Sequence, residues 1–178
     1  MALKQCIDNY IRAKDGNRPH LMPRAFSQDA VLEMEVLTES ISFPARVEGV
    51  QGITETLVSQ FATRYENVYT FCIGNAPVGV PSFECKWLVV MSEKATGLAR
   101  VGHGRYEWQL SEQTGRLDAL KIVIADMLVL PAETVTALSA WANSLPYPWC
   151  PPSRLEEDLP DLPEISVLRE IIGELQHP

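Results

Sequence analysis

Apolar residues recur at helical spacing near the start of the chain, at positions i, i+3, i+4, i+7 and i+8, which share one face of a helix. These positions are Leu3, Cys6, Ile7, Tyr10 and Ile11. A turn-forming run at residues 15–17 ends the pattern. Pro19 then suits the first turn of a short second helix that reaches Phe26. The chain therefore begins with two predicted helices.

Residues 30–37 alternate between apolar and acidic positions, which is typical of a strand with one buried face. The preceding residues 27–29 are expected to form a turn, and residues 38–48 a polar connection. A helix from about Ile53 to Tyr65 follows, because apolar residues recur there at every fourth position.

The next four segments have the composition of strands in long hairpins. They span residues 68–78, 82–93, 98–111 and 116–130, and turn candidates separate the last three at residues 94–97 and 112–115. A helix opening at Pro131 completes the predicted body, residues 1–145.

The C-terminal extension, residues 146–178, differs in composition from the body. Residues 146–163 contain six prolines, which predicts an extended linker. Asp161 is a candidate cap for a last helix, whose apolar stripe consists of Ile165, Leu168, Ile172 and Leu175. A lone helix of this length is marginal in water, so it must pack on its own domain or on a partner chain.

Charge and cysteine placement narrow the function classes. The formal net charge of -8 argues against nucleic-acid and anionic-membrane partners. Cys6, Cys72 and Cys85 lie in apolar patterns that predict buried free thiols, whereas Cys150 lies in the Pro-rich stretch, where a thiol can be exposed. Reduced cysteines, and Lys4 and Asp8 within the first helix, lead us to expect a cytoplasmic protein.

Several short segments, taken in order, carry a family resemblance. They are Tyr10-Ile11-Arg12-Ala13, Phe26-Ser27-Gln28-Asp29-Ala30-Val31-Leu32-Glu33, Val47-Glu48-Gly49-Val50-Gln51-Gly52-Ile53, Gly104-Arg105-Tyr106-Glu107 and Gly115-Arg116-Leu117. With the order of elements, residues 1 to about 145 resemble the SnoaL-like branch of the nuclear-transport-factor-2-like superfamily. That superfamily includes ketosteroid isomerases, polyketide cyclases, scytalone dehydratase and limonene epoxide hydrolase.

The resemblance implies an α+β fold in which a strongly curved, mostly antiparallel sheet wraps around N-terminal helices and encloses a cone-shaped apolar cavity. It also implies a homodimer through the outer sheet face. Ketosteroid isomerases need a carboxylate base and an oxyanion hole built from a tyrosine and a neutral aspartic acid. Tyr10 falls at the tyrosine position, Met34 at the base position and Tyr106 near the aspartic acid position. Because methionine cannot abstract a proton, ketosteroid isomerase activity is not expected.

Four residues are candidates for chemistry: Tyr10, His103, Tyr106 and Asp126. Tyr10 can donate a hydrogen bond to a ligand, or be a core tyrosine with its hydroxyl at the rim. His103 can act as an acid or base, but strand alternation places it opposite Tyr106 and Trp108, where a structural or interface role fits. Asp126 lies among apolar residues, so it is either a functional buried carboxylate or a strand-end group reaching water or an arginine.

The expected pocket is lined by aromatic and methionine side chains, which suit an adaptable apolar site as well as a plain core. These candidates are Met22, Phe26, Met34, Trp87, Met91 and Trp108. The sequence has no zinc spacing and no phosphate-binding loop, so we expect neither a metal nor a cofactor. Two functions remain open: a cofactor-independent isomerase, dehydratase or cyclase acting on a small hydrophobic oxygenated molecule, and a non-catalytic ligand-binding or dimeric interaction module.

Overall fold

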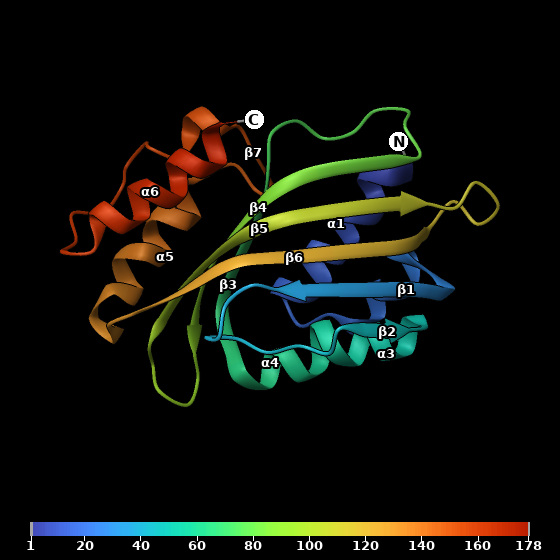
Figure 1. Ribbon diagram of the computed structural model, residues 1–178, viewed down its shortest axis with the longest axis horizontal. Coiled ribbons are helices and arrows are strands. Elements are labelled where there is room, and N and C mark those ends of the chain that lie inside the picture. The colour runs from blue at the N-terminus through green and yellow to red at the C-terminus, as the bar shows by residue number, and fades with distance from the viewer. Residues whose placement is uncertain (1, 178) are drawn as a thin grey trace.

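The computed structural model describes residues 2–177, in which one mixed sheet separates two layers of helices (Figure 1). The strands are β1 (Phe26–Val36), β2 (Arg46–Glu48), β3 (Tyr65–Ile73), β4 (Ser82–Glu93), β5 (Ala99–Leu110), β6 (Leu117–Leu130) and β7 (Trp149–Cys150). The longer helices are α1 (Ala2–Asp15), α5 (Val135–Ser144) and α6 (Ile165–Gln176). The shorter helical segments are η1 (Pro19–Leu21), α2 (Met22–Ala25), α3 (Val50–Thr54), η2 (Glu55–Ser59), α4 (Gln60–Arg64), η3 (Ala132–Thr134) and η4 (Pro152–Arg154).

The strand order is β2-β1-β6-β5-β4-β3-β7. Pairing is antiparallel from β6 through β3 and between β1 and β2, whereas β1 runs parallel to β6 and β7 runs parallel to β3. The predicted α+β class with a curved, mostly antiparallel sheet is therefore confirmed. None of the helices between residues 2 and 177 is long and apolar enough to cross a membrane.

Interruptions in the strand register bend the sheet. One lies between Glu66 and Tyr69 on β3, where Asn67 adopts a φ of 54°. Another lies where Gly104 of β5 crosses β6, leaving one residue of β6 without a partner. An added Cβ on Gly104 would lie 1.9 Å from the carbonyl oxygen of Val123, so glycine permits this close approach. Such bulges increase local twist and curvature.

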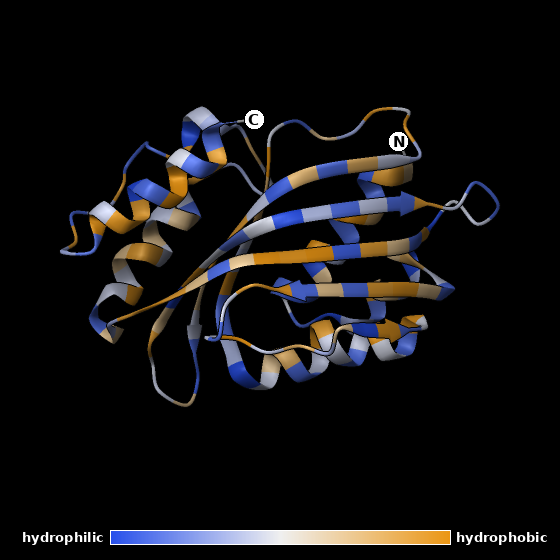
Figure 2. Cartoon of the chain, in the orientation of Figure 1, coloured by the Kyte–Doolittle hydropathy of each residue, from blue (hydrophilic) through white to orange (hydrophobic). Residues whose placement is uncertain are grey.

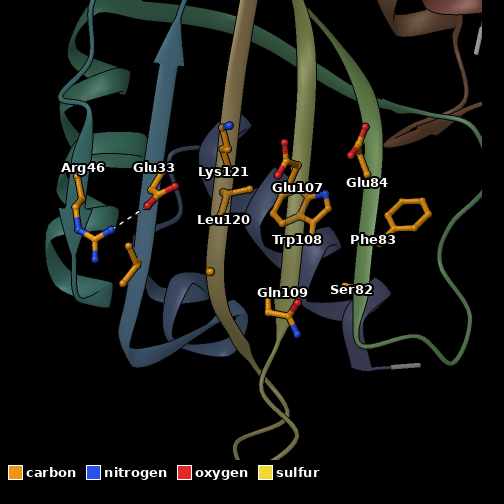
Figure 3. A pocket seen from close by; sticks show the side chains of 12 residues that line it. Glu33, Arg46, Ser82, Phe83, Glu84, Glu107, Trp108, Gln109, Leu120 and Lys121 are labelled. Carbon is orange, nitrogen blue, oxygen red and sulfur yellow. Dashed lines mark hydrogen bonds and ion pairs between the residues drawn. The ribbon is translucent and has the colours of Figure 1, made fainter.

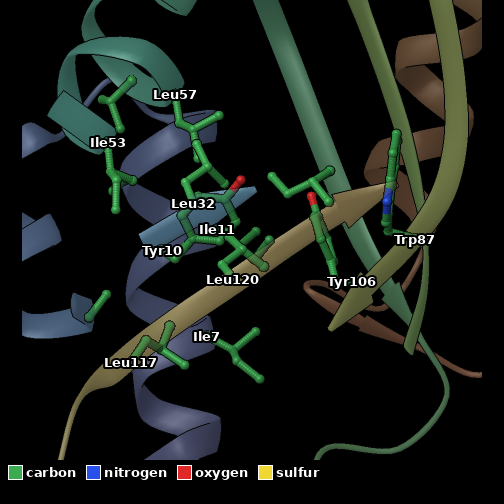
Figure 4. Close-up of a cluster of buried hydrophobic side chains, with 14 of the residues drawn as sticks. Ile7, Tyr10, Ile11, Leu32, Ile53, Leu57, Trp87, Tyr106, Leu117 and Leu120 are labelled. Carbon is green, nitrogen blue, oxygen red and sulfur yellow. The ribbon is translucent and has the colours of Figure 1, made fainter. Parts of the chain in front are cut away.

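The inner face of the sheet packs against the N-terminal helices. Fully buried residues of α1, among them Ile7, Tyr10 and Ile11, contact the inner positions of β4, β5 and β6. Figure 4 shows this cluster, in which side chains of α1 lie near those of β6 and near the rings of Tyr106 and Trp87. The helical stretch from α3 to α4 closes the same side.

The outer face is covered at one end by α5 and α6 (Figure 1). Leu168, Ile172 and Leu175 of α6 are buried in a second cluster with Leu88 and Val101 of the sheet. Figure 2 shows the alternation of polar and apolar positions along the strands that lets one sheet contribute to both clusters. The last helix thus packs on its own chain.

Several local predictions differ from the structure. Residues 27–29, predicted as a turn, belong to β1, because a register shift between Phe26 and Val31 lets the strand begin earlier. The predicted polar connection 38–48 ends in the short strand β2.

The predicted extended linker also differs. It contains β7 and a helical turn, so that Cys150 and Leu155 are buried. Glu164 rather than Asp161 precedes α6, and no side chain caps that helix.

Candidate functional site

A small cavity of about 30 Å³ lies between the inner sheet face and the N-terminal helices. Its walls are almost entirely apolar and come from α1, β1, the β1–β2 connection, the α3–α4 stretch and strands β4 to β6. The lining residues are Tyr10, Lys14, Met34, Ile41, Phe43, Leu57, Phe61, Trp87, Val89, Met91, Tyr106, Ile122, Ile124 and Met127. This volume holds about one water molecule, so a larger ligand requires the walls to move.

Tyr10 brings an unpaired donor to this cavity. Its side chain is completely buried, and its hydroxyl makes no hydrogen bond with another described residue. Burial raises the pKa of Tyr10 far above its usual value, and the nearby hydroxyl of Tyr106 offsets only part of that rise. Tyr10 therefore stays protonated and keeps a proton to donate, which is costly to leave unpaired inside a protein.

Tyr106 lies beside Tyr10, with the two ring centroids 6.2 Å apart in an edge-to-face arrangement. Trp87 stacks on Tyr106 at 5.5 Å and donates a hydrogen bond from Nε1 to the carbonyl oxygen of Val123 at 3.2 Å. Burial also raises the pKa of Tyr106 well above normal. Both cavity tyrosines are therefore neutral donors with fixed rings, and Figure 4 shows them within the same cluster.

Lys14 is a cavity residue that the sequence reasoning missed. It follows Tyr10 by one helical turn on α1, and only 9% of its surface is exposed. Its Nζ donates to Thr70 Oγ1 at 2.7 Å, lies 3.2 Å from Asp15 Oδ1 and lies 4.6 Å from the centre of the Phe61 ring. The i, i+4 spacing from Tyr10 was the available signal, but a lysine in a last helical turn ordinarily indicates favourable interaction with the helix dipole.

The segment between β1 and β2, residues 37–45, closes one end of the cavity with Ile41 and Phe43. Ser40 fastens this segment: its hydroxyl donates to the carbonyl oxygen of Met127 at 2.6 Å, and its own carbonyl accepts from Arg100 at 2.7 Å. Arg100 in turn pairs with Glu93 at 2.8 Å. The segment has no regular secondary structure, so few bonds hold it in place.

The structure places the predicted ligand-binding residues in two groups. Met34, Trp87 and Met91 line the cavity. Met22, Phe26 and Trp108 are buried in the same cluster but do not line it. Phe26 and Trp108 contact the ring of Tyr10 edge-on, with centroid distances of 5.9 and 5.5 Å, and so hold it in place.

His103 and Asp126 lie away from the cavity. They are paired neighbours on β5 and β6 and share the outer sheet face. His103 Nδ1 lies 3.7 Å from Glu174 of α6. Asp126 is half-buried and accepts a hydrogen bond from the backbone N–H of Met127 at 2.7 Å, so it is not the isolated buried carboxylate considered above. Of the four catalytic candidates, only Tyr10 and Tyr106 converge.

The cavity has donors but no proton acceptor of the usual kind. Its described lining contains no carboxylate and no histidine, and Met34, the position that the resemblance assigns to the base, is one of the lining residues. Within residues 2–177, no three His, Cys, Asp or Glu side chains are grouped so that they could hold a metal ion. The arrangement can hold and polarise an oxygen atom, but it offers no obvious group to remove a proton.

A wider hollow of about 680 Å³ lies on the open half of the outer face (Figure 3). Its charged lining residues form ion pairs within it or at its edge: Arg46 with Glu33 at 2.9 Å, Glu107 with Arg105 at 2.9 Å, and Lys121 with Glu35 at 3.2 Å. These ion pairs are solvent-exposed, so each contributes little to stability or to ligand binding. We therefore take the inner cavity as the candidate site.

Comparisons with known proteins identify similar structures only. No protein-family model matches the sequence, and the search of curated proteins finds no match. A solved NTF2-like protein of unknown function from Exiguobacterium sp. 255-15 is 16% identical, with a TM-score of 0.51 over 68% of this chain and 98% of that chain. An LEH-like epoxide hydrolase from M. tuberculosis is 12% identical, with a TM-score of 0.51 over 69% of this chain and 81% of that chain. A computationally designed 17-OHP binder is 10% identical, with a TM-score of 0.53 over 68% of this chain and 91% of that chain.

Proposed function

We propose that this chain, which has the nuclear-transport-factor-2-like fold, binds a small apolar molecule that carries a hydrogen-bond-accepting oxygen. The fold alone does not decide this, because similar structures include both an enzyme and a designed binder. The proposal depends on the inner cavity and on the groups that line it.

The observation that most supports this proposal is the buried, unpaired hydroxyl of Tyr10 beside a space for one oxygen-sized group. A buried donor without a partner costs about 1–3 kcal/mol. A ligand oxygen in that space would accept the hydrogen bond and remove this cost. The apolar walls would then take up the rest of the molecule.

The cavity can enlarge because of what surrounds it. Met34, Met91 and Met127 line it, and methionine side chains repack with little cost. Ile41 and Phe43 belong to the irregular segment 37–45, which is fastened mainly through Ser40. Movement of this segment and of the methionines would admit a ligand from the end of the cavity nearest α4.

A second candidate function is an isomerase, dehydratase or cyclase acting on an oxygenated molecule. Tyr10, Tyr106 and Lys14 favour it, because fixed donors aimed at one oxygen stabilise negative charge that develops there during reaction. The absence of a carboxylate or histidine from the described cavity lining favours binding without turnover.

Two further expectations stay predictions. The homodimer implied by the resemblance would have to use the open half of the outer face, since α5 and α6 occupy the other half. A reducing, cytoplasmic location is consistent with the four buried free cysteines.

The test is a titration with acetophenone and with ethylbenzene, which has a similar shape but no oxygen, followed by NMR at the backbone amides of Gly102 and Gly104. We expect wild type to bind acetophenone more tightly, and Tyr10→Phe to weaken acetophenone about 3- to 10-fold while leaving ethylbenzene unchanged. Tyr69→Phe is the matched control, because its hydroxyl lies outside the cavity, 3.4 Å from Asn143. Binding of neither probe, or equal binding of both to wild type, would contradict the proposal.

A further inference from the structure

We propose that the preferred ligand is an apolar monocarboxylate, and that the ammonium of Lys14 makes the cavity favour a negatively charged ligand over a neutral one. This inference rests on the proposed function, because it concerns the same cavity. It names the chemical class of the ligand and a specificity-determining residue that the sequence did not reveal.

Lys14 has one donor to spare on the cavity side. A lysine ammonium has three N–H groups, and two of them are directed to Thr70 Oγ1 and Asp15. Lys14 is nonetheless a lining residue of the cavity, and its Nζ lies over the Phe61 ring at 4.6 Å. The face of an aromatic ring attracts a cation but leaves the third N–H without an oxygen acceptor.

Asp15 forms an ion pair with Lys14, but the lysine is only one of four donors to this carboxylate. Thr70 donates to it from its backbone N–H at 2.6 Å and from its hydroxyl at 2.7 Å, and the hydroxyl of Tyr147 donates at 2.9 Å. The lysine is the longest of the four contacts, at 3.2 Å.

Two arginines near this ion pair add positive charge that Asp15 alone does not balance. Arg12 and Arg18 line the recess on the opposite side of Asp15, together with Tyr147. No described ion pair occupies either of them. The end of α1 is therefore locally basic in a chain whose overall net charge is -8.

The two donors on α1 match the two oxygens of a carboxylate. Tyr10 and Lys14 are one helical turn apart and line the same cavity. One carboxylate oxygen would accept from the Tyr10 hydroxyl and the other from the Lys14 ammonium, while the apolar part would lie against the methionines and Trp87. A neutral ketone has a single accepting oxygen, which the Tyr10 hydroxyl would occupy, so it would gain little from the ammonium of Lys14.

The alternative is that Lys14 makes a structural ion pair only, which would hold Asp15 and Thr70 together without affecting any ligand. The two possibilities differ in what they predict for ligand charge. A structural ion pair gives no preference for an anion over a neutral molecule of similar shape.

Wild type provides the first test. We expect benzoate to bind at least about tenfold more tightly than acetophenone at about pH 7, because hydrogen bonds between charged groups are the stronger ones. If benzoate binds no more tightly than acetophenone, the inference is overturned whatever the variants do. If benzoate does not bind while acetophenone still binds and its affinity depends on Tyr10, only this inference is contradicted. If no probe binds, the proposed function is contradicted as well.

The second test uses Lys14→Met and Lys14→Gln, which remove the charge while keeping a side chain of similar length. We expect both to lose the preference for benzoate and to bind acetophenone within about twofold of wild type. Lys4→Met is the matched control, because Lys4 is an exposed lysine on the same helix that pairs with Asp8. An unchanged preference for benzoate in a folded Lys14 variant would assign Lys14 a structural ion pair only and overturn the inference.

Discussion

The inner and outer faces of the same sheet use polar groups in opposite ways. On the outer face the charged residues are numerous, but they pair with one another or, near α6, anchor a helix. Lys86, for instance, donates to the carbonyl oxygen of Glu174 at the end of α6. On the inner face polar groups are few, yet Tyr10 is buried without a partner. The comparison teaches that an unmatched donor that also lines a cavity marks a candidate site better than a high density of charge does.

The largest predicted effect tests how α6 packs on the outer face. Leu168→Asp would bury a carboxylate among Leu88, Val101 and Ile172, so the free energy of unfolding should fall by about 3–5 kcal/mol in urea titrations. Val167→Asp, on the exposed side of the same helix, should change it by less than about 0.5 kcal/mol. If the two substitutions changed the free energy of unfolding equally, the packing of α6 on the sheet would not stabilise the fold.

A smaller effect is expected on the inner face at Gly104. A Cβ there would meet the carbonyl oxygen of Val123 and the ring of Trp87, so Gly104→Ala should lower the free energy of unfolding by about 1–3 kcal/mol. Gly173→Ala is the matched control, since nothing lies within 4 Å of its added Cβ and α6 should gain about 0.5–1 kcal/mol. Chemical denaturation measures both. A neutral Gly104→Ala would contradict the close crossing of β5 and β6.

The smallest effect concerns the pH dependence of the outer face. Burial lowers the pKa of His103 below its ordinary value of about 6.5; Glu174 and Asp126 oppose this shift and Lys86 adds to it. The unfolded chain therefore takes up the proton more readily, so this contribution to stability is present above about pH 6.5 and is lost as the pH falls. His103→Gln should reduce the loss of stability between about pH 7.5 and about pH 5.5, whereas His20→Gln, at an exposed position, should not. The same pH dependence in both variants would exclude His103 as its source.

Elements bounded by strong local signals could be predicted from the sequence. The hairpin turn near Gly97, which has a φ of 72°, fixed the ends of β4 and β5 to within about a residue. The start of β1 could not be predicted, because its pairing with β6 is parallel and joins segments far apart in the chain. The burial of Cys150 likewise depends on its pairing with Ile73 of β3.

The candidate site was predictable where residue type and alternation agreed. Tyr10 and Tyr106 belong to the apolar faces of a helix and a strand, and they meet in the structure. His103 belongs to the opposite strand face, as alternation indicated. Lys14 could not be inferred, because its burial depends on Thr70 and Phe61, which lie on other elements.

The coupling free energy between the Tyr10 hydroxyl and the oxygen of a bound ligand tests the central claim most directly. It follows from four dissociation constants, those of wild type and Tyr10→Phe with acetophenone and with ethylbenzene. We predict a favourable coupling of about 0.5–1.5 kcal/mol. A coupling of zero, with both molecules bound, would contradict the account, because the buried hydroxyl would then not be the group that holds the ligand.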